Sequence, residues 1–278
     1  MTTLTTPTSA HAWRPDVTGH MPEDVVPDAL VLQLSSVGAR IEGDAVALRV
    51  PLVKDDAAHV VPEGSPIPEA APELAEAMVY TRKIAKLLRI SREQFLQPGA
   101  DRNISRAAAR SIIAKADELF LTGEADPTTG QAGILNQSIP EIGALDTGLD
   151  TLVDAVAATQ AAGGNPSHIL VSPDLWATIR KVKTGDGSAT SLLGVGAADA
   201  RPLLLGLPVV VNRAMPAGTG LVLDSTDIVS AVSNVESAIS EHAYFGADSI
   251  AMRALFRFGA TVVHPDRHAT FTAPTATA

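Results

Sequence analysis

Two histidines near the C-terminus are the first residues whose spacing could support chemistry. His264 and His268 have the H-x3-H spacing that on a helix places both imidazoles on one side, as in many zinc sites. Pro265 lies between them, and because proline restricts the backbone and lacks an N–H it disfavours a continuous helical turn. We therefore expect exposed tail histidines rather than a metal site.

Paired carboxylates, phosphate loops and activated nucleophiles are not indicated either. Asp117 and Glu118 are adjacent, and adjacent residues of a helix point to different sides, so they cannot act as an acid–base pair. The glycine-rich phrases GDGSAT and GVGAAD lack the flanking elements and the Lys-Ser/Thr of a phosphate loop. G-x-S-x-G is absent, and the chain has no cysteine. We expect no catalytic site, no metal and no cofactor, with Trp176 packed in a core.

The composition describes a chain that can fold but that has little general affinity for nucleic acid. Hydrophobic residues make up 46% of the 278 residues and aromatic residues 4%, and the net charge is −10. Folding in the cytosol is expected because disulfides are excluded. The N-terminus resembles no signal peptide, and no apolar run approaches the length of a membrane-spanning helix.

The basic residues are unevenly distributed. Nine of the 21 Lys and Arg residues fall between Arg82 and Lys115. Such a stretch is either solvated and neutralised by salt bridges, or it forms a face turned toward DNA or toward acidic neighbours. The sequence leaves both interpretations open.

The N-terminal third indicates an arm, a helix and a projecting loop. Residues 1–22 are rich in Thr and Pro without periodicity, so we expect an arm that is ordered only on another subunit. A helical pattern covers 23–36, and the alternating strand 43–53 leads into a proline-rich projecting loop. The returning segment 78–90 combines helical and strand signals, which local sequence alone does not resolve.

The rest of the chain interleaves helices and strands. A clear apolar stripe predicts a helix from about Asn103 to Leu121. Further helices are expected near 146–162 and in SPDLWATIRKVK, a surface loop at 184–200, and strands in HILVS, LLLGLPVVVN, LVLD, DIVSAVSNVESAISE and SIAMRALFRFGATVV. Because no regular βαβ repeat appears, the predicted fold class is α+β.

Several phrases, in this order, resemble the major capsid proteins of tailed bacteriophages with the Hong Kong 97 fold. They are VVPEGSPIPE, RKIAKLLRISREQF, ADELFLTGEADPTTGQAGIL, PSHILVSPDLWATIRKVK, LLLGLPVVVNRAMPAGTGLVLD and FGADSIAMRALFRFGATVVHP. Together they span most of the chain, and the resemblance makes the 78–90 segment a strand.

The resemblance implies five segments and two assembly loops. The segments are an N-terminal arm with a short helix (1–42), an extended β-loop (43–78), the first part of a peripheral domain with a long spine helix (79–129), an axial domain (130–230), and the closing strands of the peripheral domain with the C-terminal tail (231–278). The expected assembly residues are Pro62, Glu63, Gly64 and Pro66 in the first loop, and Gly185, Asp186 and Gly187 in the second.

The implied function is a major capsid protein that forms hexamers and pentamers of an icosahedral head. Such a shell encloses double-stranded DNA without sequence-specific binding. It is part of the virion and assembles in the host bacterial cytoplasm without a membrane. A portal is an expected partner. Because the resemblance begins near Gly43 and leaves no room for a long scaffolding segment, we also expect a separate scaffolding protein, with assembly without one as the alternative. Decoration proteins are further candidates.

The cross-link of the family's type member is not expected here. That bond joins a loop lysine to an asparagine with the help of a glutamate, and the matching positions are Gly64, Asp248 and Leu255. An amide cross-link needs an amine and a carboxamide, so we expect a shell held together non-covalently. Lys54 is the one loop lysine that could replace the missing amine.

Two other function classes compete with this interpretation. An encapsulin-type nanocompartment shell shares the fold and encloses protein cargo, but the extended loop, the GLPVVV phrase and the N-arm resemble phage capsids more closely. A soluble α+β enzyme would need a nucleophile, a metal cluster or a cofactor loop. The contents of the particle distinguish a nanocompartment from a phage head. A protein that stays monomeric or dimeric under all conditions would favour the enzyme.

Overall fold

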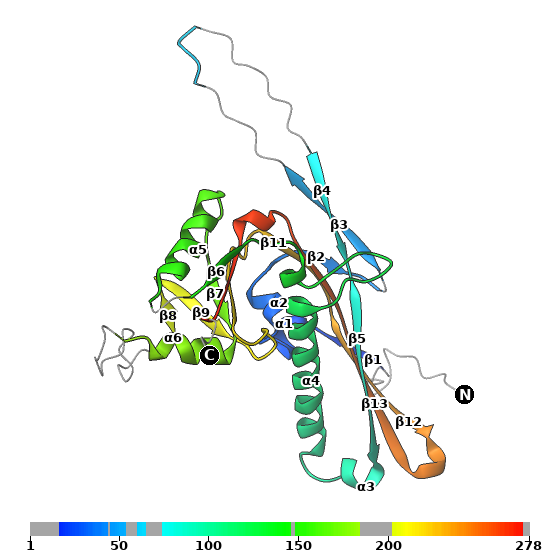
Figure 1. Ribbon diagram of the computed structural model, residues 1–278. Helices are drawn as coiled ribbons and strands as arrows, with labels where there is room; N and C mark the ends of the chain where they lie inside the picture. The colour runs from blue at the N-terminus through cyan, green and yellow to red at the C-terminus, as the bar shows by residue number, and fades with distance from the viewer. Residues whose placement is uncertain are drawn as a thin grey trace.

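The computed structural model describes residues 17–43, 45–53, 60–64, 74–145, 148–183 and 202–274. Two six-stranded sheets, one two-stranded ribbon and several helices make up this part of the chain (Figure 1). The α+β expectation is confirmed. The expected loop at 184–200 lies outside the described residues. No helix in the described part is both long enough and apolar enough to span a bilayer.

The first sheet is built on strand β13 (Ser249–Val262), which pairs on both sides. On one side it is antiparallel to β5 (Arg82–Ser91), and on the other to β11 (Ile228–Ser233) and β12 (Val235–Tyr244). Two short strands complete the sheet: β2 (Ser36–Ile41), parallel to β11, and β1 (Val17–His20), antiparallel to β12. The segment 78–90 is therefore strand, because β5 pairs with β13 along its whole length.

Helix α4 (Ala100–Thr122) covers one face of this sheet. Its buried stripe includes Ala108, Ile112 and Ala116, which recur every four positions and so lie on one side of the helix. This stripe packs in one cluster with Phe256 of β13. On the opposite face of the sheet, Val229 and Ala231 of β11 pack with Ile41 and Val79 in a second buried cluster.

The second sheet has the order β6-β14-β10-β7-β9-β8. Its strands are β6 (Glu141–Ala144), β7 (His168–Val171), β8 (Leu203–Leu204), β9 (Leu207–Val211), β10 (Thr219–Leu223) and β14 (Ala269–Thr272). Helices α5 (Asp150–Ala161) and α6 (Pro173–Lys181) contribute Leu152 and Leu175 to its core. Trp176 packs partly buried against the same cluster, as expected for a core residue.

Short elements complete the described chain. They are α1 (Pro22–Val25), α2 (Leu30–Gln33), α3 (Arg92–Phe95) and the single turns η2 (Ile134–Asn136), η3 (Phe245–Ala247) and η4 (Pro265–Arg267). The ribbon consists of β3 (Ala47–Val53) and β4 (Leu74–Tyr80) in antiparallel register. It runs away from the body of the molecule, and only Thr81 separates β4 from β5 (Figure 1).

Three expectations require correction or division. The helix expected over 23–36 is wrong, because the helical structure breaks at the turn containing Pro27 and strand β2 begins at Ser36. The arm expected to order only on another subunit pairs within its own chain at Val17–His20, where β12 offers an open strand edge. The closing segment 231–278 divides between the sheets, since β14 joins the second one.

Candidate assembly surfaces

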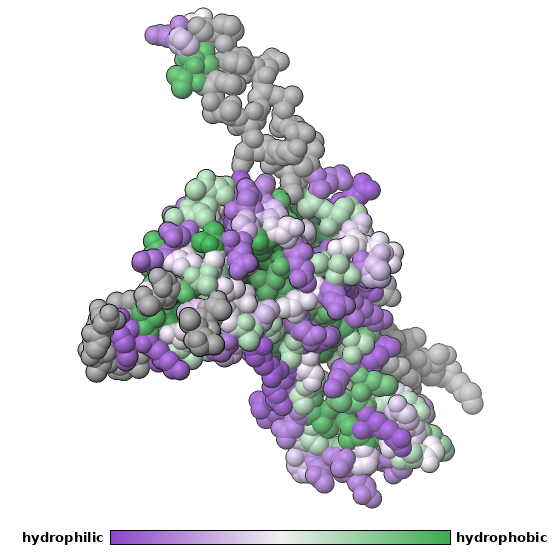
Figure 2. Space-filling view, viewed as in Figure 1, coloured by the Kyte–Doolittle hydropathy of each residue, from purple (hydrophilic) through white to green (hydrophobic). Residues whose placement is uncertain are grey.

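The β3–β4 ribbon presents the first candidate surface. Residues 60–64 lie at its far end (Figure 1), where Val60 is fully exposed and Pro62, Glu63 and Gly64 are exposed as well. Figure 2 shows hydrophobic residues in this tip. A two-stranded ribbon is marginally stable alone in water. The ribbon is therefore suited to lie against another surface.

Of the seven residues expected from sequence to form assembly contacts, three can be placed. Pro62, Glu63 and Gly64 lie together in the exposed tip, where Gly64 has φ +81° and thus occupies a conformation that favours glycine. Pro66, Gly185, Asp186 and Gly187 lie outside the described residues.

A second candidate surface is the end of the first sheet, where α3 and η3 meet. Arg92 ties the two turns together, since its N–H donates to the Asp248 carbonyl at 3.1 Å and its Nε lies 3.0 Å from Asp248 Oδ1. Beside this link, Leu96 is 74% exposed and Phe245 is 83% exposed. Two large apolar side chains that are exposed to water on two linked turns are typical of a contact surface.

The two sheets are joined by a buried polar cluster around Asp227. Its carboxylate lies 2.6 Å from His264 Nδ1 and 3.2 Å from His268 Nε2, and it also accepts the His264 backbone N–H at 2.8 Å. His268 Nδ1 accepts the N–H of Asp224 at 3.4 Å, so Nε2 carries the proton donated to Asp227. Turn η4 places both histidines on this one carboxylate.

This cluster corrects the expectation of exposed tail histidines. His268 is buried and His264 is half-buried, because the 3-10 turn begun by Pro265 folds both against Asp227. Burial would raise the pKa of the Asp227 carboxyl, but the hydrogen bonds from His268 and His264 outweigh it and hold the pKa below the usual 3.8. In the described part of the chain, no group of three or more His, Cys, Asp or Glu residues is arranged to hold a metal ion.

Asp117 is a second buried carboxylate with a structural role. One oxygen accepts the Leu30 N–H at 2.9 Å, and the other accepts the Asn212 amide at 2.8 Å. The first bond caps helix α2, and the second holds the segment that follows β9. Burial raises the pKa of the Asp117 carboxyl despite these hydrogen bonds. Glu118 points outward to Lys115, so the two acids face different surroundings, as expected.

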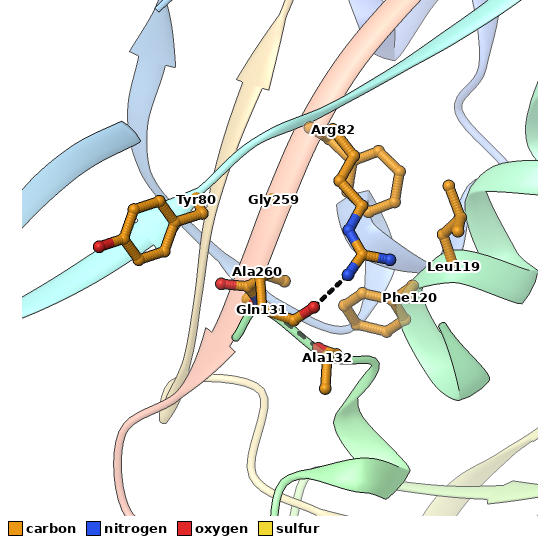
Figure 3. A pocket seen from close by; sticks show the side chains of 9 residues that line it. Tyr80, Arg82, Leu119, Phe120, Gln131, Ala132, Gly259 and Ala260 are labelled. Atoms are coloured by element: carbon orange, nitrogen blue, oxygen red, sulfur yellow. Dashed lines mark hydrogen bonds between the residues drawn. The ribbon is translucent and has the colours of Figure 1, made fainter. Parts of the chain in front are cut away.

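A small pocket lies between α4, β4, β5 and β13 (Figure 3). Arg82 points into it and donates to the backbone carbonyls of Glu124 and Gln131, while Gln131 donates to the carbonyl of Ala260. The cavity holds about 20 Å³, which is room for about one water molecule. It is far below the hundreds of Å³ that a small-molecule site needs. Its polar groups hold the loop after α4 to the sheet.

The described surfaces are thus suited to contact rather than to catalysis, and the comparison with known families agrees. A family model described as the phage capsid family matches residues 15–271. The chain belongs to the phage capsid family. This capsid protein is therefore a structural component of the phage head and not an enzyme, as expected from its sequence.

Solved phage capsids share the fold of this capsid protein. A structure from Gordonia phage Cozz covers 96% of the chain and 90% of its own length, with a TM-score of 0.69 at 17% identity. The capsid of an empty GTA particle covers 99% and 96%, with a TM-score of 0.68 at 16% identity. Mycobacterium phage Bobi covers 89% and 91%, with a TM-score of 0.65 at 16% identity. A search of curated proteins finds no match.

The positions that match the family's cross-link are now placed in this capsid protein. Gly64 is in the exposed tip, Asp248 is held by Arg92, and Leu255 lies within β13. None of the three supplies an amine or a carboxamide. Lys54 lies outside the described residues.

Sequence reasoning missed the partners of the two buried carboxylates that hold the elements of the capsid protein together. Asp227 is 37 and 41 positions from its two histidine partners, and no local pattern points to it. Asp117 did carry a signal, because it lies among the apolar residues of the α4 stripe, three positions before buried Phe120. A charged residue in an apolar stripe requires a buried partner.

Proposed function

We propose that this capsid protein assembles with copies of itself, as hexamers and pentamers, into the icosahedral head of a tailed phage with a double-stranded DNA genome. The observation that carries the proposal is the pairing of an exposed ribbon with an apolar sheet end in a chain of the phage capsid family. Burial of such surface stabilises contacts by roughly 25 cal/mol per Å². Repetition over a closed shell makes the assembly cooperative.

The ribbon and the sheet end have different proposed roles. The β3–β4 ribbon lies over a neighbouring subunit, and the end that carries Leu96 and Phe245 meets another copy. We assign the first sheet with α4 to a peripheral domain and the second sheet, including β14, to an axial domain. The loop that contains Gly185, Asp186 and Gly187 then faces the centre of a hexamer or pentamer.

Electron microscopy of the expressed full chain tests this function. Closed shells are the expected result, and a chain that stays monomeric or dimeric under all assembly conditions would contradict it. The contents of particles from infected cells distinguish a phage head from a nanocompartment. Double-stranded DNA would support a phage head, whereas packed protein cargo would indicate a nanocompartment instead.

Further partners follow from the same proposal. A portal at one vertex and a separate scaffolding protein would complete head assembly in the bacterial cytoplasm, and decoration proteins would bind the finished surface. Shells formed by the capsid protein alone would show that scaffolding is dispensable. Shells that close only after a scaffolding protein is added would show that it is required.

We predict that the shell is held together without covalent bonds between subunits. Gly64, Asp248 and Leu255 stand where an amine, a carboxamide and an acid would be needed. Purified particles boiled in detergent should run on a denaturing gel as one band near 28.8 kDa. A ladder of covalent multimers would contradict the prediction and would make Lys54 the candidate source of the amine.

A further inference from the structure

The N-terminal half of α4 carries three arginines on one side. Arg102, Arg106 and Arg110 are exposed and follow one another at intervals of four residues, so they form a row in which successive positions are about 6 Å apart. We call this the arginine row. Figure 2 shows hydrophilic residues along the edge of the molecule that α4 forms.

No carboxylate in the described residues forms an ion pair with the arginine row. Two other basic residues of the stretch from Arg82 to Lys115 differ from the row. Arg92 pairs with Glu241 and Asp248, and Lys115 pairs with Glu118. The nine basic residues between Arg82 and Lys115 therefore divide into a part engaged within the chain and a part left open to a partner.

The row works against the helix that carries it. Like charges four residues apart repel and destabilise a helix. Arg102 also lies in the first turn, where the helix dipole disfavours a cation. The helix's own stability therefore does not explain the row.

The surroundings of the row favour DNA over the surface of another protein. Next to the arginines lie Asn103, Ser105 and Ala107, all exposed, so the row has no large apolar anchor of the kind that protein interfaces use. Interfaces with DNA are more polar and more positively charged, and Asn and Ser are common phosphate ligands. Duplex DNA offers about one charge per 1.7 Å of its axis, so a row of cations meets phosphates in any register.

We propose that the arginine row of α4 binds the phosphate backbone of duplex DNA, which places the α4 side of the first sheet toward the genome. This inference rests on the proposed function as a shell around double-stranded DNA. It concerns contacts without sequence preference, because guanidinium groups on phosphates read no bases.

Binding of a short duplex of arbitrary sequence to the full, unassembled chain tests the inference by fluorescence anisotropy over a series of salt concentrations. The triple variant R102Q/R106Q/R110Q keeps a similar helix propensity. Its slope of log affinity against log salt should be shallower by about 2.7, or about 0.9 for each lost phosphate contact. A fourfold rise in salt then weakens the unsubstituted chain about 40-fold more than the variant.

Two control variants make this result specific. K83Q/R89Q/R253Q removes the same charge from exposed positions on the face of the sheet opposite α4 and should keep the original slope. R102K/R106K/R110K retains the charges and should also keep it. An equal loss of slope in the first control, or no measurable DNA binding by the unsubstituted chain, would overturn the inference.

Shell formation by the same variants separates this inference from the proposed function. Shells of the glutamine variant that form normally, together with the shallower slope, support both. If that variant fails to form shells while its slope is unchanged, the row binds an acidic surface of another copy, and the inference is overturned. If the unsubstituted chain forms no shells, the proposed function fails whatever the DNA result.

Discussion

Asp227 is the residue at which the two sheets are held together. Its buried carboxylate accepts hydrogen bonds from the ring and the backbone of His264 and from the ring of His268, and Arg267 lies 3.7 Å away. Such bonds to a charged acceptor are stronger than those between neutral groups. The cluster therefore fixes the turn that carries the chain from the first sheet into β14.

Substitution of Asp227 by Asn should lower the free energy of unfolding at neutral pH by about 1.5–3 kcal/mol. The asparagine amide offers one acceptor oxygen in place of two, and its NH2 group would face an N–H donor of His264 or His268. Because the fold lowers the pKa of Asp227, the carboxylate's contribution is complete above the usual value of 3.8 and is lost as the pH falls through the lower folded value. The difference between variant and unsubstituted chain should therefore shrink in that acidic range.

Chemical denaturation of the unassembled chain at neutral pH and at decreasing acidic pH measures both effects. Asp266→Asn is the matched control, because Asp266 is exposed in the same turn, and it should change stability little. A stability difference for Asp227→Asn that stays constant down to full protonation would show that the carboxylate's charge is not the cause.

At the scale of elements, the connection between the ribbon and the first sheet depends on a close approach of two backbone segments. Gly259 of β13 faces the carbonyl of Tyr80 so closely that an added Cβ would lie 2.0 Å from that oxygen. Real Cβ atoms do not approach an oxygen so closely. Glycine at this position lets the chain pass from β4 into β5 while staying against β13.

Gly259→Ala should therefore destabilise the protein by about 1–3 kcal/mol, as overpacking does in a well-packed interior. Thermal or chemical unfolding provides the measurement. Gly246→Ala is the control, since an added Cβ there meets nothing within 4 Å. Equal stability of the two variants would show that β13 shifts without strain.

The elements also show how far sequence reasoning reaches. The stripe expected from Asn103 to Leu121 corresponds to α4 at Ala100–Thr122, because a long amphipathic period is a local property. Local sequence left the segment 78–90 ambiguous because the strand character of its β5 part comes from pairing with β13, at least 160 positions further along the chain. The partners of Asp117 and Asp227 were equally out of reach, since a local pattern does not show where a polar side chain finds its match.

At the scale of the whole molecule, the three most exposed large apolar side chains of the described residues lie at two extremities. The ribbon tip with Val60 and the sheet end with Leu96 and Phe245 leave apolar side chains in water. A single chain gains nothing from this exposure, whereas a shell in which these surfaces meet neighbouring copies, as proposed, would cover it in every copy.

Phe245→Ser should abolish or strongly reduce shell formation while leaving the unfolding of the unassembled chain within about 0.5 kcal/mol, as for exposed residues in general. Phe245 is 83% exposed, so its side chain contributes little to the stability of its own chain and is available for the proposed contacts between copies. Electron microscopy and denaturation measure the two effects. Phe245→Leu keeps an apolar side chain and should still assemble. Normal shells from the serine variant would show that this sheet end does not contribute to contacts between copies.

Thr81 is the only residue between β4 and β5, so the projection and the sheet strand form almost one continuous run from Leu74 to Ser91. If a neighbouring copy docks on the ribbon, as proposed, no flexible loop separates the force that it applies there from strand β5. Because β5 pairs with β13 and both pack with helix α4, a displacement of the ribbon would be passed on to the interior of the same subunit.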